Sequence, residues 1–392
     1  MLGTFVQSLV MITDSAFLSR YSTLSFDASG NAGLIYVTLF VGLTGIADSS
    51  LIVMARRIGQ NIRAAINPVL QSAAIIILGI ALLFFLFIQF GIGDLLMSNT
   101  KSKALAQEQI DFLSIRSFGF IVTIPMLILN SFFLATGKTW AILLSTLTFA
   151  TFNVILDYLL IFGFWNIEPM GVRGAALASV ISEGIASLVL IIILFNSKER
   201  YRYQIFYRFH ISKEALIKIL RVGFPLVAQG FISLSSWTVF FTLIEQTGLY
   251  NLTVSQNIRF VYFLAFVPIF GFAATTKTYV AQYMDAKETS AIPIIIKRIQ
   301  LLILLFLLIR LMFGSILIFG LTTPYYQTIN GSGNTRITLF IETLATASYI
   351  TYSYITIKVL NWSLVGFWTV EYLYFSLIGI LSFLYLYFFN WR

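Results

Sequence analysis

The sequence contains no cysteine and only one histidine among its 392 residues. Without cysteine the chain can form neither disulfides nor thiolate metal sites, and one histidine cannot build a zinc site of the H-E-x-x-H type. Charged residues are also scarce, at 10% of the chain, whereas 58% is hydrophobic and the mean hydropathy is +0.89. Because so few charges could not cover the surface of a soluble domain, the composition predicts a membrane protein.

Apolar runs of about 20 residues, each long enough to cross a bilayer as a helix, recur from one end of the chain to the other. Short polar breaks separate them, and no stretch between them is long enough for a soluble domain. We therefore predict an all-α integral membrane fold. The predicted helices cover residues 2–18, 34–54, 66–90, 112–134, 140–165, 172–195, 222–247, 254–281, 294–320, 336–359 and 363–389.

The formal charge of +9 comes from basic residues that lie in loops between these helices. With the N-terminus inside, most of them fall on the inner side, and the outer loops hold Arg20, Lys101, Lys103, Arg173 and Lys358. This asymmetry follows the positive-inside rule and predicts a plasma (inner) membrane protein with both termini in the cytoplasm. The basic residues do not gather on one face, so we expect no nucleic-acid partner.

The sequence repeats itself in two halves. Residues 139–165 follow an ATGKT loop and residues 335–361 follow a GSGNT loop, and both lead through a short break into a last long helix. We predict an N-terminal lobe at 1–197, a basic cytoplasmic linker at 198–221 and a C-terminal lobe at 222–392. Two parallel six-helix bundles are an architecture typical of transporters.

The second half is shorter than the first. Pro68 to Gly137 spans 69 positions and Pro293 to Gly333 spans 40, a shortfall of 29. This predicts that helix ten is mostly missing and that Pro324–Gly331 is its remnant. Since Met1 aligns with Val227, the start of helix one is predicted to be missing too.

Polar residues interrupt three of the predicted helices at one level. The segment NVILDYLLIFG places Asn153 and Asp157 one helical turn apart on a single face. At 1.5 Å per residue, Asp14 lies roughly 9 Å below the outer interface, Asp157 roughly 12 Å and Ser179 roughly 10 Å. A charge at such depth costs about 2.5 to 3.5 kcal/mol or more, so it usually marks an ion or proton path.

Two chemistries suit Asp14, Asn153 and Asp157. Their oxygens could bind Na⁺, or the two carboxylates could share a proton. We therefore predict a cation-coupling site for H⁺ or Na⁺, with Ser179 as a further member and no other cofactor. The alternative is that these side chains only hydrogen-bond neighbouring helices.

Further polar and aromatic residues are predicted to line a cavity or a substrate path. They are Glu371, Glu183, Asp48, Tyr36 and Trp237. Glu371 would lie roughly 13 Å below the outer interface, and Tyr36 or Trp237 could stack on an aromatic cation. Glu342, near the inner end of its helix, is predicted to pair with an interfacial base.

Several of these motifs resemble one transporter family. NVILDYLLIFG, followed by MGVRGAALASVISE, is similar to helices five and six of the multidrug and toxic compound extrusion (MATE) antiporters. MITDSAF resembles the family's first-helix aspartate segment, and GSGNTR its loop before helix eleven. The resemblance implies a monomer that exports cationic, amphipathic compounds in exchange for H⁺ or Na⁺ as two lobes rock. It places Asp14, Asn153 and Asp157 at the N-lobe cation site, with Ser179 where a threonine is common.

The chain also departs from that pattern. Ser233 stands where many members carry a glutamate on helix seven, and the helix-ten acid of some members would fall in the missing segment. Coupling is therefore expected to rest on the N-terminal lobe. The alternatives are a flippase for lipid-linked oligosaccharides and a non-functional truncated transporter. No constellation of nucleophile, base and metal ligands appears, so an enzyme is not expected.

Overall fold

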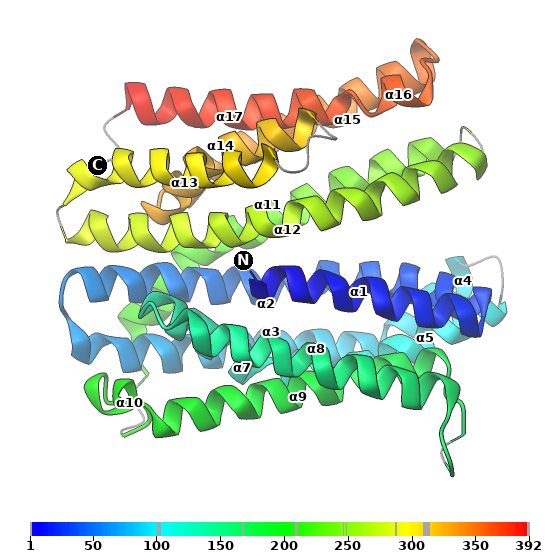
Figure 1. Cartoon of the computed structure of the whole chain (residues 1–392), viewed down its shortest axis with the longest axis horizontal. Helices are drawn as coiled ribbons and strands as arrows, with labels where there is room; N and C mark the ends of the chain where they lie inside the picture. Colours follow the sequence, from blue (N-terminus) through cyan, green and yellow to red (C-terminus); the bar gives the residue numbers. More distant parts are fainter. Residues whose placement is uncertain are drawn as a thin grey trace. The chain divides into compact units, whose positions relative to one another are not determined.

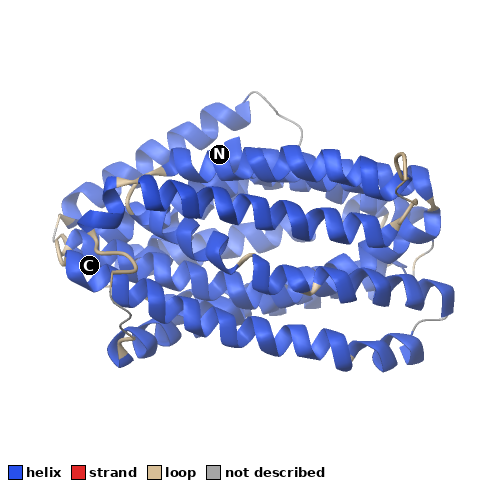
Figure 2. Ribbon diagram, turned by 90° about the horizontal axis from the view of Figure 1, so that it is seen from below, coloured by secondary structure: helices blue, strands red, loops and turns tan. Residues whose placement is uncertain are grey.

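The computed structural model describes residues 2–99, 103–166, 168–207, 211–245, 247, 249–286, 288–308 and 314–389. These residues form helices joined by short turns, with no strand among them (Figure 2). The chain divides into two compact units. We call residues 2–54 with 63–219 the N-terminal unit, and residues 55–62 with 220–392 the C-terminal unit. The predicted lobe boundaries at 197 and 222 stay a prediction.

The N-terminal unit contains the helices coloured blue to green in Figure 1. They are α1 (Leu2–Tyr21), α2 (Thr23–Gly59), the 3₁₀ turn η1 (Arg63–Ala65), α3 (Ile66–Phe90), α4 (Ile92–Asn99), α5 (Lys103–Arg116), α6 (Phe118–Val122), α7 (Ile124–Ala135), α8 (Thr139–Phe162), α9 (Val172–Asn196) and α10 (Lys198–Arg202). The last residues of α2 belong to the other unit.

The predicted helix 112–134 begins earlier, at Lys103, and is bent. The axis turns by 44° between the segment that ends at Val122 and the one that begins at Ile124. Pro125 occupies the first turn of α7 and has no N–H to continue the hydrogen bonds of the preceding helix. Thr123 Oγ1 instead donates to the Gly119 carbonyl at 2.6 Å, which satisfies a polar group at the break.

Helices α8 and α9 approach each other closely near their connection. A Cβ on Gly174 would lie 2.6 Å from the Leu160 carbonyl carbon and oxygen, so only glycine fits there. Helix α1 joins this pair through an apolar cluster of Leu18, Ile161 and Ala175. The packing fixes the three helices that carry the predicted coupling site.

The C-terminal unit contains most of α11 and the helices that follow. They are α11 (Lys213–Glu245), α12 (Leu249–Asp285), the 3₁₀ turn η2 (Thr289–Ala291), α13 (Ile292–Leu308), α14 (Gly314–Gly331), α15 (Thr335–Tyr354), the π-helical turn η3 (Ile355–Val359), α16 (Leu364–Phe367) and α17 (Val370–Phe388). An aromatic core holds them together, and Phe266, Phe319 and Phe375 pack ring to ring within it.

Helix ten differs from its prediction. The predicted helix 294–320 is two helices, α13 of 17 residues and α14 of 18, and residues 309–313 lie outside the described part. Pro324–Gly331 is the second part of α14 rather than a remnant. The apolar run gave no stop signal, because no proline or glycine stands between Pro293 and Gly314. The shortfall of 29 residues is therefore shared by two short helices.

The two halves match in backbone as well as in sequence. Gly137 and Gly333, in the turns before α8 and α15, have φ of 75° and 81°. Trp165 and Asn361, at the far ends of the repeated segment, have φ of 54° and 48°. Each pair is separated by the same 196 positions, so the register of the repeat is fixed at both ends.

Among the described residues, six helices are long and apolar enough to cross a membrane, or seven if the bent pair forms one span. The shorter α13 falls below this length. The helical content and these spans confirm the predicted class, a multi-pass membrane protein.

Candidate functional site

Asp14, Asn153 and Asp157 meet where α1 packs against α8. Asn153 and Asp157 are fully buried, and Asp14 is partly buried. The carboxyl groups of Asp14 and Asp157 lie within hydrogen-bonding reach of each other. With its amide nitrogen turned toward them, Asn153 donates to Asp14 Oδ1 at 3.0 Å and to Asp157 Oδ2 at 3.3 Å. The structure thus brings together the three residues that the sequence had placed at one depth.

This arrangement suits a shared proton. Two ionised carboxylates have only acceptors, so a hydrogen bond between them requires that one carries a proton. The Asn153 amide supplies N–H donors to the remaining acceptor positions. Asp157 Oδ1 is buried without a hydrogen-bond partner, so the site retains one open acceptor atom.

Ser179 does not join this group in the described structure. It is half-buried on α9, two turns from the start of that helix, and makes no hydrogen bond to Asp14, Asn153 or Asp157. Its predicted place in the coupling site therefore stays a prediction.

Glu183 and Tyr36, both predicted to line a path, lie together around Arg116. The Arg116 guanidinium binds both carboxylate oxygens of Glu183, at 2.7 and 2.5 Å. The ring of Tyr36 covers the guanidinium at 4.1 Å and stacks on Phe120, with centroids 4.6 Å apart. The Tyr36 hydroxyl is buried and has no hydrogen-bond partner.

Gly119 makes room for this cluster. A Cβ there would overlap Arg116 Nη1 and lie 2.8 Å from the Tyr36 hydroxyl and 2.9 Å from Glu183 Oε2. The glycine stands just before the bend between α6 and α7. The break in the helix and the missing side chain together admit the buried ion pair.

Arg116 links this cluster to the carboxyl pair, because its charge interacts with Asp14. The sequence patterns assigned no role to Arg116. Its position could have indicated a role, because a lone arginine in an apolar helix usually pairs with an acidic residue. The partner lay 67 positions away, beyond any local pattern.

The remaining predicted residues lie elsewhere. Asp48 is half-buried on α2. Trp237 is on α11, packed against the aromatic core of the C-terminal unit. Glu371 is fully buried at the start of α17 and accepts a hydrogen bond from the Tyr349 hydroxyl at 3.0 Å. Nothing among the described contacts brings them to the Asp14 group.

The prediction for Glu342 was wrong. It pairs with no base in the described residues and is 3% exposed. Its two oxygens accept hydrogen bonds from the hydroxyls of Tyr326, at 2.8 Å, and Tyr374. The sequence could not reveal this, because the tyrosines come from α14 and α17 and converge only in the folded unit.

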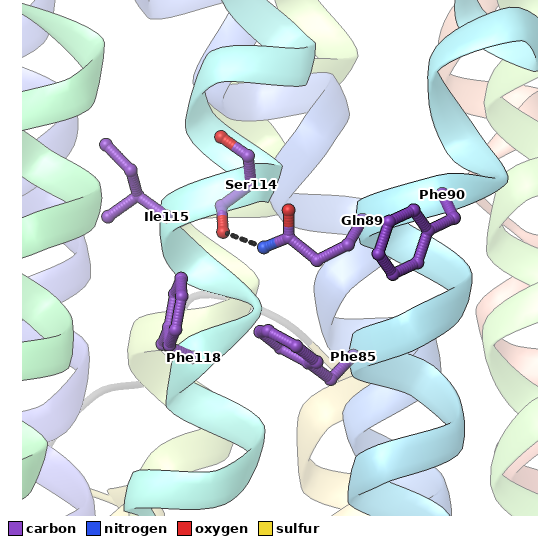
Figure 3. A pocket seen from close by; sticks show the side chains of 6 residues that line it. All are labelled: Phe85, Gln89, Phe90, Ser114, Ile115 and Phe118. Carbon is purple, nitrogen blue, oxygen red and sulfur yellow. Dashed lines mark hydrogen bonds between the residues drawn. The ribbon is translucent and has the colours of Figure 1, made fainter.

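A separate groove opens between α3 and the α5–α6 segment (Figure 3). Its volume is about 390 Å³, and it is lined by Phe85, Gln89, Phe90, Ser114, Ile115 and Phe118. Gln89 Nε2 donates to the Ser114 carbonyl at 2.8 Å across its floor. None of the predicted site residues lines it.

Comparison with known proteins shows similarity to one transporter family. The MatE family model matches residues 1–159, the part that contains Asp14, Asn153 and Asp157. The probable multidrug resistance protein NorM of Thermotoga maritima is 25% identical over 297 residues, 72% of this chain and 61% of that protein. A protein of the same name from Bacillus cereus is 27% identical over 193 residues, 49% of this chain and 43% of that protein. The chain is therefore similar to MATE transporters, and it spans 61% and 43% of the length of these two relatives.

Solved structures show the MATE fold over nearly the whole chain. An outward-facing multidrug resistance MATE transporter of the MOP superfamily matches with TM-score 0.88 and 20% identity. A MOP superfamily transporter from Pyrococcus furiosus, for which a reversed polarity of the binding pocket suggests a different function, matches with TM-score 0.87 and 19% identity. Both alignments cover 98% of this chain and 92% of the other. They support the fold, whereas the curated relatives above are matched over 61% and 43% of their length.

Proposed function

We propose that this protein is a proton-coupled antiporter that exports cationic, amphipathic compounds across the plasma membrane. The relatives named as multidrug resistance proteins and the MATE fold support export of small molecules. MATE structures solved with the small molecules MaL6 and Br-NRF support a small-molecule binding role. The single observation that carries the coupling proposal is the close approach of the Asp14 and Asp157 carboxyl groups beside the Asn153 amide.

The proposed cycle depends on one negative charge. When the shared proton leaves, the pair gains a charge that attracts either a new proton or a cationic substrate. Proton binding removes that charge and weakens the hold on the substrate. Because each ligand lowers the affinity for the other, entry of protons drives release of the compound.

The position of Asn153 favours H⁺ over Na⁺. A sodium site would need several oxygen atoms directed at one point. We assign the Asn153 amide with its nitrogen toward both carboxylates, because in that orientation it donates to both; its oxygen then faces away from them, and the two carboxyl groups lie close to each other. We propose no cofactor besides the proton, a monomeric transporter, and both termini in the cytoplasm.

The oligosaccharide flippase is less well supported. Recognition of a diphosphate favours an unpaired basic charge, and Arg116 is neutralised by Glu183. The side chain of Arg259 and the whole of Arg310 lie outside the described residues. The present contacts therefore favour a cationic substrate.

Ethidium efflux from a drug-sensitive bacterial host tests the proposal. Wild-type protein should lower cellular ethidium with or without Na⁺, and Asp157→Asn should abolish this at equal amounts of protein in the membrane. Asp94→Asn removes an exposed acid on α4 of the same unit and should leave efflux intact. Efflux retained by Asp157→Asn would contradict the proposed coupling site.

A further inference from the structure

The C-terminal unit holds an acid that the proposed cycle does not use. Glu371, in the first turn of α17, has 0% exposure. The Tyr349 hydroxyl donates to its Oε1 at 3.0 Å, and its Oε2 is buried with no hydrogen-bond partner. A buried polar atom left unpaired costs about 1 to 3 kcal/mol, so the position calls for a ligand or a proton.

Glu371 belongs to a cluster of tyrosines. The ring of Tyr349 packs edge-on against that of Tyr374, with centroids 5.5 Å apart. The Tyr374 hydroxyl donates to Glu342 and lies 3.2 Å from Ser233 Oγ on α11. Two buried carboxyl groups are thus connected through the side chains of α15 and α17.

The internal repeat relates this cluster to the site in the N-terminal unit. Gly137 is equivalent to Gly333, and Trp165 to Asn361, at an offset of 196 positions in the sequence. At the same offset, Asn153 is equivalent to Tyr349, and Asp157 to Ser353. Tyr349 therefore occupies the place of the amide that serves the first carboxyl pair.

The last helices of the two units continue this correspondence. The spans Val172–Asn196 and Leu364–Phe388 both have 25 residues, so Ser179 corresponds to Glu371. In the C-terminal unit the acid stands on α17, which belongs to the equivalent of α9, whereas Asp157 of the N-terminal unit stands on α8. Ser353, which replaces Asp157, is fully buried, and its hydroxyl has no hydrogen-bond partner.

Among the residues that the structure describes, no cation compensates the charge of Glu371. In the described part of the unit no lysine or arginine pairs with Glu371 or Glu342. The titratable groups that face Glu371 are tyrosines: Tyr349 from α15, Tyr262 from α12 and Tyr374 from its own helix. An uncompensated buried carboxylate is costly, and one proton removes its charge.

A proton suits this site better than a metal ion. Tyr349 presents its O–H to Glu371, whereas a sodium site needs several lone pairs directed at one point. The unpaired Glu371 Oε2 is one atom on which a proton can reside.

We propose that Glu371 is a second exchangeable proton site, held by Tyr349 in the C-terminal unit at the repeat equivalent of the Asp14–Asn153–Asp157 group. Its use in antiport depends on the proposed function, but the binding of the proton does not. The protein would then take up one proton in each unit. Glu342, whose two oxygens are both hydrogen-bonded, connects to the site through Tyr374.

Infrared titration of the full-length protein in detergent tests this without transport. The carboxylic acid C=O band should respond to pH in Asp157→Asn, and the double variant Asp157→Asn with Glu371→Gln should lose the part of that response that Glu371 contributes, while the remaining Asp and Glu residues respond in both. Adding Na⁺ at constant ionic strength should leave the band unchanged. Identical pH responses in the single and double variants would overturn the proposal, and so would loss of the band on adding Na⁺.

A second pair of variants separates the hydrogen bond from general effects on folding. Tyr349→Phe should keep the Glu371 band and move the midpoint of its titration, because the hydrogen bond from the Tyr349 hydroxyl to the carboxyl is lost. Tyr372→Phe changes an exposed tyrosine on the same helix and should leave the midpoint in place. Equal midpoints in both variants would overturn the role given to Tyr349. Failure of the efflux test with an intact Glu371 band would instead count against the proposed function alone.

Discussion

The guanidinium of Arg116 binds both oxygens of Glu183, and the ring of Tyr36 covers its face. The sequence contains these three residues in three different helices, and the fold makes them one buried group. The ion pair allows α5 and α9 to carry opposite charges inside an apolar unit, and it places a positive charge within electrostatic reach of Asp14. Several predictions depend on this group and on the turns that set the repeat.

Removing either partner of the Arg116–Glu183 pair should destabilise the protein. Arg116→Gln or Glu183→Gln leaves a buried charge uncompensated, and we expect each to cost about 3 to 5 kcal/mol. The double variant removes both charges and should cost clearly less than the sum of the single changes. Thermal unfolding in detergent measures this cycle, and additive losses would show that the pair contributes no coupling.

Gly119→Ala should disturb the same group without removing a charge. The new methyl would overlap Arg116 and approach Glu183 and Tyr36, so the ion pair must shift and stability should fall. Gly79→Ala on α3 is the matched control, since no atom lies within 4 Å of its Cβ. That change should be neutral or stabilise by about 0.5 to 1 kcal/mol through helix propensity. Equal melting temperatures for the two variants would contradict the tight packing at Gly119.

The equivalent turns of the two units should respond differently to alanine. Gly137→Ala meets no neighbour, and its cost should come from left-handed backbone alone, about 1 to 2 kcal/mol. Gly333→Ala carries the same backbone cost and also displaces Arg56, whose guanidinium carbon would lie 2.7 Å from the new methyl and which donates to the Ser332 carbonyl. Melting curves should therefore rank Gly333→Ala as the less stable; the reverse order would show that Arg56 is not held in this turn.

Local sequence signals predicted the helices well where polar residues or glycines mark their ends. The predicted helix 66–90 matches α3 at both ends, and 172–195 differs from α9 by one residue. The same signals failed between Leu308 and Gly314, where an apolar run conceals the boundary between α13 and α14. Hydropathy indicates which segments can lie in a bilayer, but it does not predict where one helix ends and the next begins.

The meeting of Asp14, Asn153 and Asp157 was predictable because depth and helical spacing are both local quantities. Asp14 and Asp157 stand at similar depths in their own helices, so their meeting required only that α1 and α8 be neighbours. Glu183 and Glu371 were predicted as acids within the helices, but their partners were not, and Glu342 was placed beside an interfacial base. Arg116, Tyr374 and Tyr349 come from other helices, and choosing among the many tyrosines and arginines requires the tertiary packing.

Transport by purified protein in proteoliposomes tests the central claim most directly. A proton gradient alone should drive ethidium movement by the wild type and by Asp94→Asn, and should drive none by Asp157→Asn at equal reconstitution. A sodium gradient alone should drive none in any of the three. Transport by Asp157→Asn at the wild-type rate, or movement driven by the sodium gradient alone, would contradict a proton-coupled site at Asp14, Asn153 and Asp157.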